Sequence, residues 1–298
     1  MIAALYQINA PTVTSRTFYE LDTLKSTFAN SIKTSKLLIV SGSNSLFGIG
    51  SQMITQETGI PAVNTSIQAG FGINYMLHRT RALAKNGDIV LLPLEYELYM
   101  SDTLPSDVVV DYVFAHDPKY LLTHPWFIAL LSFERLALGI YSKIHSFPIE
   151  SKYPPRIINS SGDITTNQEA NITVNDRKKV EFTTPFRIKR KFTYSSFELR
   201  SIKEFADWCY NNKIKLIATW PSTIWFDSYK QPNYQDFFQN IKDFYNSIDV
   251  PVVGNYSEFM YDKSMFFDTV YHLNDRGRRY RTRQLIKLLQ PYLSEMTK

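Results

Sequence analysis

The stretch from Leu37 to Gly48, LLIVSGSNSLFG, constrains the fold of this chain more than any other. It opens with apolar residues and stops abruptly at Ser41-Gly42-Ser43-Asn44, before a second glycine. A buried strand that ends in small residues and leads into a helix is typical of α/β proteins. Small residues let the backbone turn sharply there, and the first turn of the helix presents free N–H groups.

Two further apolar segments follow, over 62–65 and 88–94, and a helical pattern precedes each of them. This alternation of strands and helices predicts βαβ units and a parallel sheet. The segment 88–94 is apolar on both faces, as expected of a central parallel strand. The other elements expected are helices over 15–33, 50–58 and 72–84, a helix that begins with a capping box of Ser195 and Glu198, a strand over 215–220, a helix over 233–246, a strand over 250–253 and a helix capped by Asn274.

The pattern is lost from about 100 to 194, where we expect an insertion within one domain that spans 1–298. The segment 125–141 is so apolar that it favours a helix buried against the sheet. The alternative is a face that docks on a membrane or on a membrane protein. The segment 151–184 is polar and rich in turn-forming residues, which predicts irregular structure with a short hairpin.

Composition limits the function classes. Apolar residues make up 44% of the chain, enough for a sizeable core. The net charge of +5 is mild, and we interpret the basic clusters 187–191 and 276–283 as solvated surface, so nucleic-acid binding is not expected. The single cysteine, Cys209, excludes an internal disulfide and a cysteine-based metal site, and we expect it to be buried. We expect neither a metal nor a cofactor.

No apolar run reaches the ~18 residues that a membrane span requires. The N-terminal stretch 1–13 lacks the basic region and long apolar core of a signal peptide. It is open to two interpretations, as the remnant of a removed membrane anchor or as a first turn of helix.

Ser43 is the hydroxyl best placed at the turn after the first strand, but a serine needs a base to act as a nucleophile. His272 lies on a loop after the last strand and just before the last helix, at the same edge of a parallel sheet as Ser43. Asp268 is close enough along this loop to orient the imidazole. Surface or packing roles are expected for the other four histidines: His78, His116, His124 and His145.

Two motifs resemble those of the SGNH (GDSL-like) hydrolases. The residues SGSNSLFGI at 41–49 are similar to the first block of that superfamily, and DTVYHLN at 268–274 is similar to its late block of Asp and His. The residues of the two motifs most resemble those of one subgroup, the cell-envelope polysaccharide O-acetyltransferases and teichoic-acid D-alanylation proteins. The resemblance covers about 36–99 and 213–289. It implies a flavodoxin-like three-layer α/β/α fold with a central parallel sheet of about five strands, and a triad of Ser43, His272 and Asp268.

The late block departs from the family pattern in its spacing. The arrangement here is Asp-x-x-x-His, one residue longer than the usual Asp-x-x-His, and the extra residue changes the direction in which Asp268 points. The alternative interpretation is that Asp268 and Asn274 only cap the loop and the helix.

The oxyanion hole also departs from the pattern. The second block of the family contributes a Gly N–H, and here either Ser66 or Gly70 stands at that position. The third block offers an Asn side chain after the third strand, whereas this chain has Leu94-Glu95-Tyr96-Glu97. An ionised Glu cannot donate a hydrogen bond, so Asn44 or backbone N–H groups are the candidates to replace that Asn.

Two residues are candidates for substrate binding, Glu97 and Trp220. Trp220, at the end of a strand, is a candidate platform for a sugar, and a core position for it is an equally good interpretation.

The resemblance implies transfer of an acyl group, in this subgroup acetyl, onto a polysaccharide hydroxyl through an acyl-Ser43 intermediate. It implies an extracytoplasmic, membrane-associated protein that works beside a membrane-bound O-acyltransferase. Two alternatives stay open. One is a carbohydrate O-acetyl esterase with the same triad, in which water is the acceptor. The other is a non-catalytic polysaccharide-binding or assembly protein on a degenerate SGNH scaffold.

Overall fold

The computed structural model describes residues 12–101, 106–122 and 155–296. The apolar segment 125–141 lies outside the described residues, so its helix stays a prediction. Of the predicted insertion, 100–194, the structure describes 100–101, 106–122 and 155–194.

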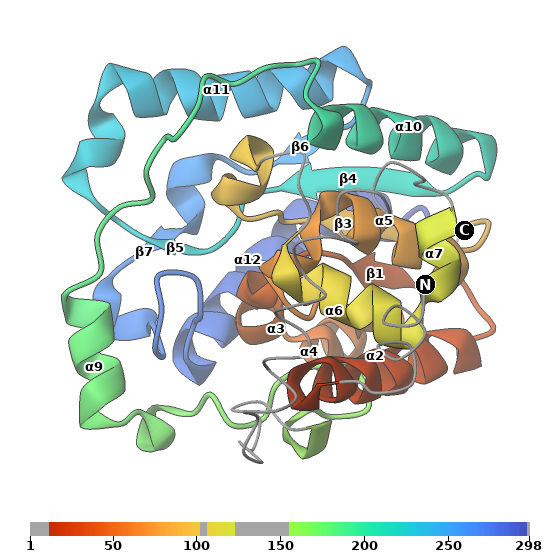
Figure 1. Cartoon of the computed structure of the whole chain (residues 1–298), viewed down its shortest axis with the longest axis horizontal. Coiled ribbons are helices and arrows are strands. Elements are labelled where there is room, and N and C mark those ends of the chain that lie inside the picture. Colours follow the sequence, from red (N-terminus) through yellow and green to blue (C-terminus); the bar gives the residue numbers. More distant parts are fainter. Residues whose placement is uncertain (1–11, 102–105, 123–154, 297–298) are drawn as a thin grey trace, which may run out of the picture.

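Five parallel strands form the central sheet in the order β2-β1-β3-β4-β6 (Figure 1). Their bounds are β1 Leu37–Ile39, β2 Ala62–Asn64, β3 Ile89–Leu92, β4 Lys215–Thr219 and β6 Val252–Val253. Counted within this sheet the order is 2-1-3-4-5, which is that of the flavodoxin-like fold. All residues of β1, β2 and β3 are buried, as expected of central strands covered on both faces. The predicted fold class is therefore confirmed.

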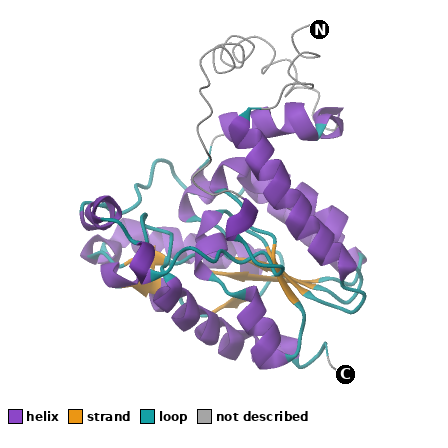
Figure 2. Ribbon diagram, turned by 90° about the horizontal axis from the view of Figure 1, so that it is seen from below, coloured by secondary structure: helices purple, strands orange, loops and turns teal. Residues whose placement is uncertain are grey.

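Helices cover both faces of the sheet (Figure 2). On one side α5 packs against α10, and elsewhere α12 packs against α3 and α4. The α-helices are α2 Val13–Ser31, α3 Ser43–Gly48, α4 Ser51–Thr58, α5 Gly72–Leu83, α6 Asp107–His116, α7 Pro118–Leu122, α9 Val174–Glu181, α10 Phe197–Asn211, α11 Pro232–Ser247 and α12 Asp275–Leu293. A second, two-stranded parallel sheet pairs β5 Thr223–Ile224 with β7 Met260–Tyr261.

Short 3₁₀ turns connect several of these elements. They are η1 Ala69–Phe71, η2 Tyr96–Met100, η3 Pro155–Ile157, η4 Glu169–Asn171, η5 Asp227–Lys230, η6 Tyr256–Phe259 and η7 Lys263–Met265. Two of them begin at the carboxyl edge of the sheet, because η1 follows β2 and η2 follows β3.

The caps of two helices test the sequence signals directly. The Asn274 side chain accepts a hydrogen bond from the Gly277 N–H, so α12 begins where predicted. The cap of α10 is Ser196, which accepts from the Leu199 N–H, so the predicted capping box at Ser195 is wrong by one residue. Ser195 and Ser196 are both residues that commonly cap a helix N-terminus. A helix that starts at either of them has the same apolar stripe, which ends at the buried Cys209.

The predicted insertion is more regular than expected. A bridge between Ile158 and Ile164 forms a short hairpin, as predicted, but the helix α9 lies in a stretch expected to be irregular. Thr173 and Asp176 form a capping box that starts α9. Only the residues Asp176 and Val180 of this helix are buried, so its sequence lacks the apolar stripe by which helices are usually found.

A buried lysine fastens the N-terminal helix to the sheet and to the hairpin. Lys25 on α2 donates hydrogen bonds to the carbonyl oxygens of Asn64 (2.8 Å), Ser66 (2.7 Å) and Gly162 (2.8 Å). Burial lowers the pKa of Lys25 to about 7, and the nearby Asp163 carboxylate opposes this shift. The ammonium joins segments of the chain that are far apart in sequence.

The interpretation of 276–283 as solvated surface is wrong for Arg281. Arg281 is fully buried, while Arg276, Arg279 and Arg283 are more than half exposed. Helix α12 lies against α3 and α4, and Arg281 is on the face turned toward them. A charge pattern in sequence cannot distinguish this face from the exposed ones.

Candidate active site

The two residues expected to form the base are in direct contact. Asp268 Oδ1 lies 2.7 Å from His272 Nδ1, and both side chains are buried, with 2% and 7% of each residue exposed. The loop folds back on itself, because the Phe267 N–H donates to the His272 carbonyl at 2.7 Å and the Thr269 hydroxyl accepts from the His272 N–H at 3.2 Å. This turn accommodates the extra residue, so the longer spacing does not separate the pair.

Ser43 begins α3, and a later residue of that helix contacts the imidazole. Phe47, four residues later, stacks on the His272 ring with centroids 4.0 Å apart and an angle of 5° between the planes. Residues i and i+4 of a helix are neighbours on one face. Ser43 is half-buried, whereas its neighbours Gly42 and Asn44 are buried. The ends of β1 and of the loop before α12 therefore meet at this point.

The turn before Ser43 requires glycine. A Cβ on Gly42 would lie 2.5 Å from the Ala69 nitrogen and 2.5 Å from Glu95 Oε1. Neither neighbour has free space to move into, since one is backbone and the other is a buried carboxylate. The close approach of η1 to the start of α3 explains the glycine at this position.

Glu95 is a residue of the site that the sequence analysis did not identify. It follows β3, is 2% exposed, and accepts hydrogen bonds from the N–H groups of Gly42 and Asn44, both at 3.0 Å. Helix α3 has no side-chain cap of its own, so this carboxylate caps it from the neighbouring strand. A negative charge at a helix N-terminus also interacts favourably with the helix dipole.

The three oxyanion candidates have their donors engaged within the protein. Asn44 Nδ2 donates to the Pro93 carbonyl at 2.8 Å and to Ser41 Oγ at 3.2 Å. The Ser66 N–H donates to Asn64 Oδ1 at 3.2 Å, and its hydroxyl donates to the Ile39 carbonyl at 3.3 Å. The Gly70 N–H donates to Gln68 Oε1 at 2.9 Å.

Two backbone N–H groups are better candidates for oxyanion donors. The N–H of Ser43 begins α3 and the N–H of Ala69 begins η1, and at these positions an N–H has no partner within its own helix. The close packing of Ala69 on Gly42 brings the two together. Ala69 was missed because nothing in its side chain marks it.

The two candidates for substrate binding have other partners. Trp220 is 3% exposed, its indole N–H donates to the Gly254 carbonyl at 3.0 Å, and Phe238 packs edge-on against it, which favours the core interpretation. Glu97 on η2 is half-buried and accepts a hydrogen bond from the hydroxyl of Tyr271. Burial raises the pKa of Glu97, and the contact ties η2 to the residue before His272.

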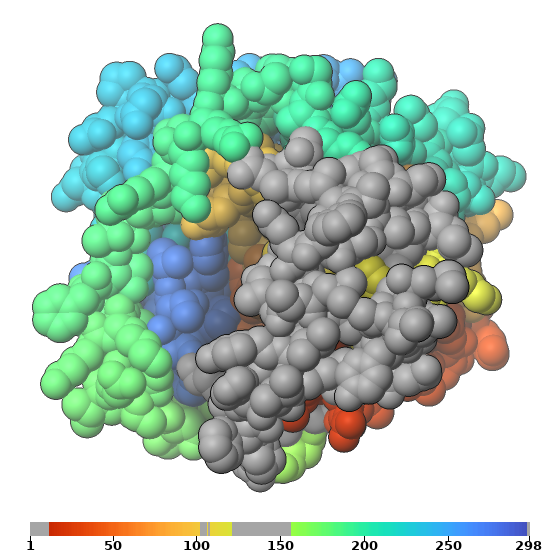
Figure 3. All heavy atoms as spheres, viewed as in Figure 1, coloured from red at the N-terminus to blue at the C-terminus, as the bar shows by residue number. Residues whose placement is uncertain are grey.

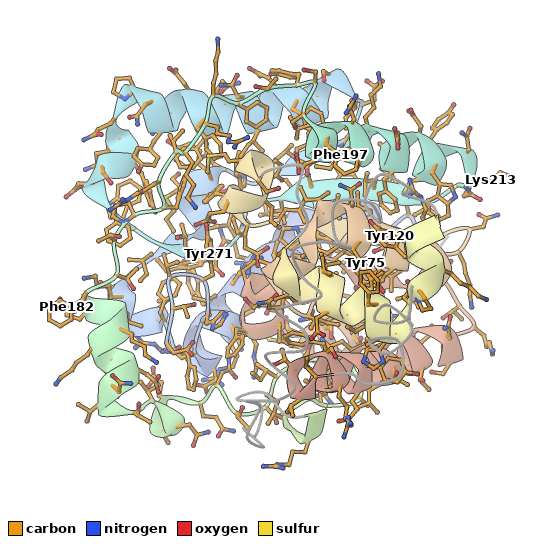
Figure 4. All side chains as sticks on the ribbon, in the orientation of Figure 1. Tyr75, Tyr120, Phe182, Phe197, Lys213 and Tyr271 are labelled. Atoms are coloured by element: carbon orange, nitrogen blue, oxygen red, sulfur yellow. The ribbon has the colours of Figure 1, made fainter. Side chains whose placement is uncertain are left out.

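The remaining described histidines lie away from this site. His78 Nε2 is 3.5 Å from Asp117 Oδ2, and the Tyr75 hydroxyl donates to the same carboxylate at 3.0 Å. His116 stacks on Tyr19 with centroids 4.4 Å apart. Tyr75 and Tyr120 form part of this aromatic group (Figure 4). His124 and His145 lie outside the described residues.

Within the described part of the chain, no cluster of three or more His, Cys, Asp or Glu side chains is arranged to hold a metal ion. Over the same residues, every helix is too short or too polar to cross a membrane.

In the space-filling view, C-terminal residues coloured blue reach the surface beside the green segment that leads from α9 to α10 (Figure 3).

Comparisons with known proteins give little more. No protein-family model matches the chain, and no curated protein does. The chain is similar to a solved structure from Streptococcus pneumonia whose name refers to platelet activating factor, with 11% identity, a TM-score of 0.41 and coverage of 93% of this chain and 94% of the other. A likeness this weak carries no argument about activity.

Proposed function

We propose that this protein is a serine-dependent enzyme of acyl-ester chemistry, with Ser43 as nucleophile, His272 as base and Asp268 as the carboxylate that orients the base. One observation carries the proposal. The buried imidazole is hydrogen-bonded to Asp268 and stacked on Phe47, one helical turn after Ser43. A surface or packing histidine needs neither a buried carboxylate partner nor a position beside a helix N-terminus that begins with serine.

The first half of the reaction forms an acyl-enzyme. The Ser43 oxygen attacks the carbonyl carbon of an ester while the His272 Nε2 takes the hydroxyl proton. Asp268 accepts a hydrogen bond from Nδ1–H and so holds the tautomer in which Nε2 is free to accept. The N–H groups of Ser43 and Ala69 stabilise the oxyanion. The tetrahedral intermediate then collapses, and the leaving alcohol receives the proton from His272.

The second half resolves the acyl-enzyme onto an acceptor. We propose a polysaccharide or oligosaccharide hydroxyl, activated by His272 as base, which gives an acetylated sugar and restores Ser43. The support is the resemblance of the two motifs to the envelope acyltransferase subgroup. The same support extends to an extracytoplasmic location and to a membrane-bound O-acyltransferase as partner. With water as acceptor the same site is an O-acetyl esterase.

Intact-protein mass spectrometry after brief incubation with a chromogenic acetyl ester tests the first half. We expect the wild-type protein to gain the mass of one acetyl group and to release the chromophore. Ser43→Ala and His272→Ala should do neither. Ser45→Ala is the matched control, because Ser45 lies on the same short helix and its hydroxyl makes only a weak contact at 3.4 Å with Asn44.

A folded wild-type protein that gains no acetyl group and turns over no ester would contradict the proposal and favour a binding protein on this scaffold. The acceptor is tested separately by adding oligosaccharide. Transfer predicts an acetylated sugar product that outcompetes hydrolysis, whereas an esterase releases acetate at a rate that does not depend on the sugar.

A further inference from the structure

Arg281 has the environment of a residue with a specific task. Its side chain is fully buried on α12, and Nη2 donates to the Trp220 carbonyl at 3.0 Å. Nη1 lies 3.1 Å from Asn44 Oδ1 and 3.1 Å from Ser222 Oγ. The position of Gly48 makes room for it, because a Cβ there would lie 2.6 Å from Nη1. The space is therefore shaped to the guanidinium.

One branch of these contacts leads to the nucleophile. Arg281 donates to both the carbonyl and the side-chain oxygen of Asn44, the residue after Ser43. Glu95 accepts from the N–H of the same residue, and the Pro93 carbonyl accepts from its Nδ2. Every polar group of Asn44 is thus held by a neighbour. Because Asn44 adjoins Ser43, this fixes the backbone that carries the nucleophile.

The other branch leads to the base. Ser222 Oγ, which accepts from Arg281, donates to the Tyr271 carbonyl at 3.1 Å. Tyr271 precedes His272 in the chain. A single guanidinium is therefore connected to the residue after the nucleophile and, through one hydroxyl, to the residue before the base.

The charges are arranged around the same turn. The Glu95 carboxylate and the Arg281 guanidinium both contact Asn44 and attract each other. Two buried charges that attract each other without forming a salt bridge are a weak source of stability, because burying them costs about as much as their attraction returns. Their presence at this place is better explained by the way in which each holds Asn44.

We infer that Arg281 is a positioning residue, which sets the distance and orientation between Ser43 and His272 by holding Asn44 directly and the Tyr271 carbonyl through Ser222. The inference rests on the proposed function and deepens it. Arg281 contacts none of the three reacting groups, so it acts through the backbone on either side of them.

The test measures the rate at which a fluorophosphonate reacts with Ser43, per folded molecule, in wild type, Arg281→Lys and Ser222→Ala. Arg281→Lys keeps the charge but loses the planar pair of donors. A misplacement of about 1 Å can lower a rate about 100-fold, so we expect a loss of this order in Arg281→Lys and about 10-fold in Ser222→Ala, where one branch is cut. With a chromogenic ester, kcat should fall while KM stays unchanged.

Lys36→Met is the matched control for loss of a buried cation. Lys36 is fully buried and pairs with Asp88 at 2.6 Å before β1 and β3, at the opposite edge of the sheet. We expect this variant to unfold at lower temperature but to label at the wild-type rate per folded molecule. A role for Arg281 in stability alone would produce the same result in Arg281→Lys.

The outcomes separate the two claims. If wild-type protein is labelled at Ser43 and both Arg281→Lys and Ser222→Ala label as fast as wild type, the positioning role is overturned and the proposed function stands. If folded wild-type protein is not labelled, the proposed function fails and the positioning role fails with it. Slower labelling in both variants, with a normal rate in Lys36→Met, is the expected result.

Discussion

Replacing Glu95 by glutamine tests directly whether this carboxylate holds the turn at Gly42, Ser43 and Asn44. The substitution keeps the shape of the side chain but leaves one acceptor oxygen for the two N–H groups, of Gly42 and Asn44, that the carboxylate binds. One N–H then faces an NH₂ group. Loss of a hydrogen bond to a charged group costs ~1.5–3 kcal/mol, and a buried unpaired N–H costs ~1–3 kcal/mol. Arg281 also loses an attractive partner.

We therefore expect Glu95→Gln to lower the free energy of unfolding by about 2–4 kcal/mol, measured by urea denaturation with an unchanged m-value. The matched control is Glu97→Gln, two residues further on. Glu97 accepts a hydrogen bond from the Tyr271 hydroxyl, which an amide oxygen also does, and burial already disfavours its charge. Glu97→Gln should therefore lower the free energy of unfolding by less than about 1 kcal/mol. If Glu95→Gln costs less than about 0.5 kcal/mol, as an ordinary surface substitution does, then the carboxylate does not hold this turn.

Three other changes test separate parts of the structure. Gly42→Ala should lower the melting temperature in a circular-dichroism melt and abolish ester turnover, because its Cβ would lie 2.5 Å from the Ala69 nitrogen; normal turnover would contradict the packing. Asp268→Asn should lower kcat about 10⁴-fold with little change in the urea midpoint, since the imidazole loses its correct tautomer; an unchanged kcat would remove Asp268 from the site. Lys25→Met should cost about 3–5 kcal/mol in urea by leaving three buried carbonyls unpaired. Because burial lowers the pKa of Lys25 to about 7 from 10.5, the unfolded chain binds more protons between these values, so wild-type stability should rise with pH through that window and Lys25→Met should lack the rise.

The fold could be predicted from the sequence because its central strands are short, apolar and buried on both faces. The segments that became β1 and β3 are short apolar runs, each followed by turn residues, and parallel strands buried on both faces have that composition. Boundaries were less certain where two adjacent residues carry the same signal, as at Ser195 and Ser196. Helix α9 was missed because most of its residues face solvent.

The site could be predicted only in part. Ser43 and His272 stand beside turn signals at the two ends of the chain, and the topology of a parallel sheet brings such ends together. Glu95 and Arg281 were missed because charged residues are usually exposed, and their role depends on contacts between segments far apart in sequence. The candidate oxyanion donors were missed for another reason, because a backbone N–H such as that of Ala69 has no sequence signature.

The stacking of Phe47 on His272 has an electrostatic consequence for the proposed reaction. When His272 takes the proton of Ser43, the imidazole becomes a cation whose ring lies 4.0 Å from the face of a phenyl ring. An aromatic face carries negative electrostatic potential and attracts a cation, with an energy of ~0.5–2 kcal/mol depending on burial. Phe47 would thus stabilise the imidazolium on one side of the ring plane while Asp268 stabilises it at Nδ1. In the proposed reaction, helix α3 would therefore carry both the nucleophile, Ser43, and an aromatic partner, Phe47, for the positive charge that forms on His272.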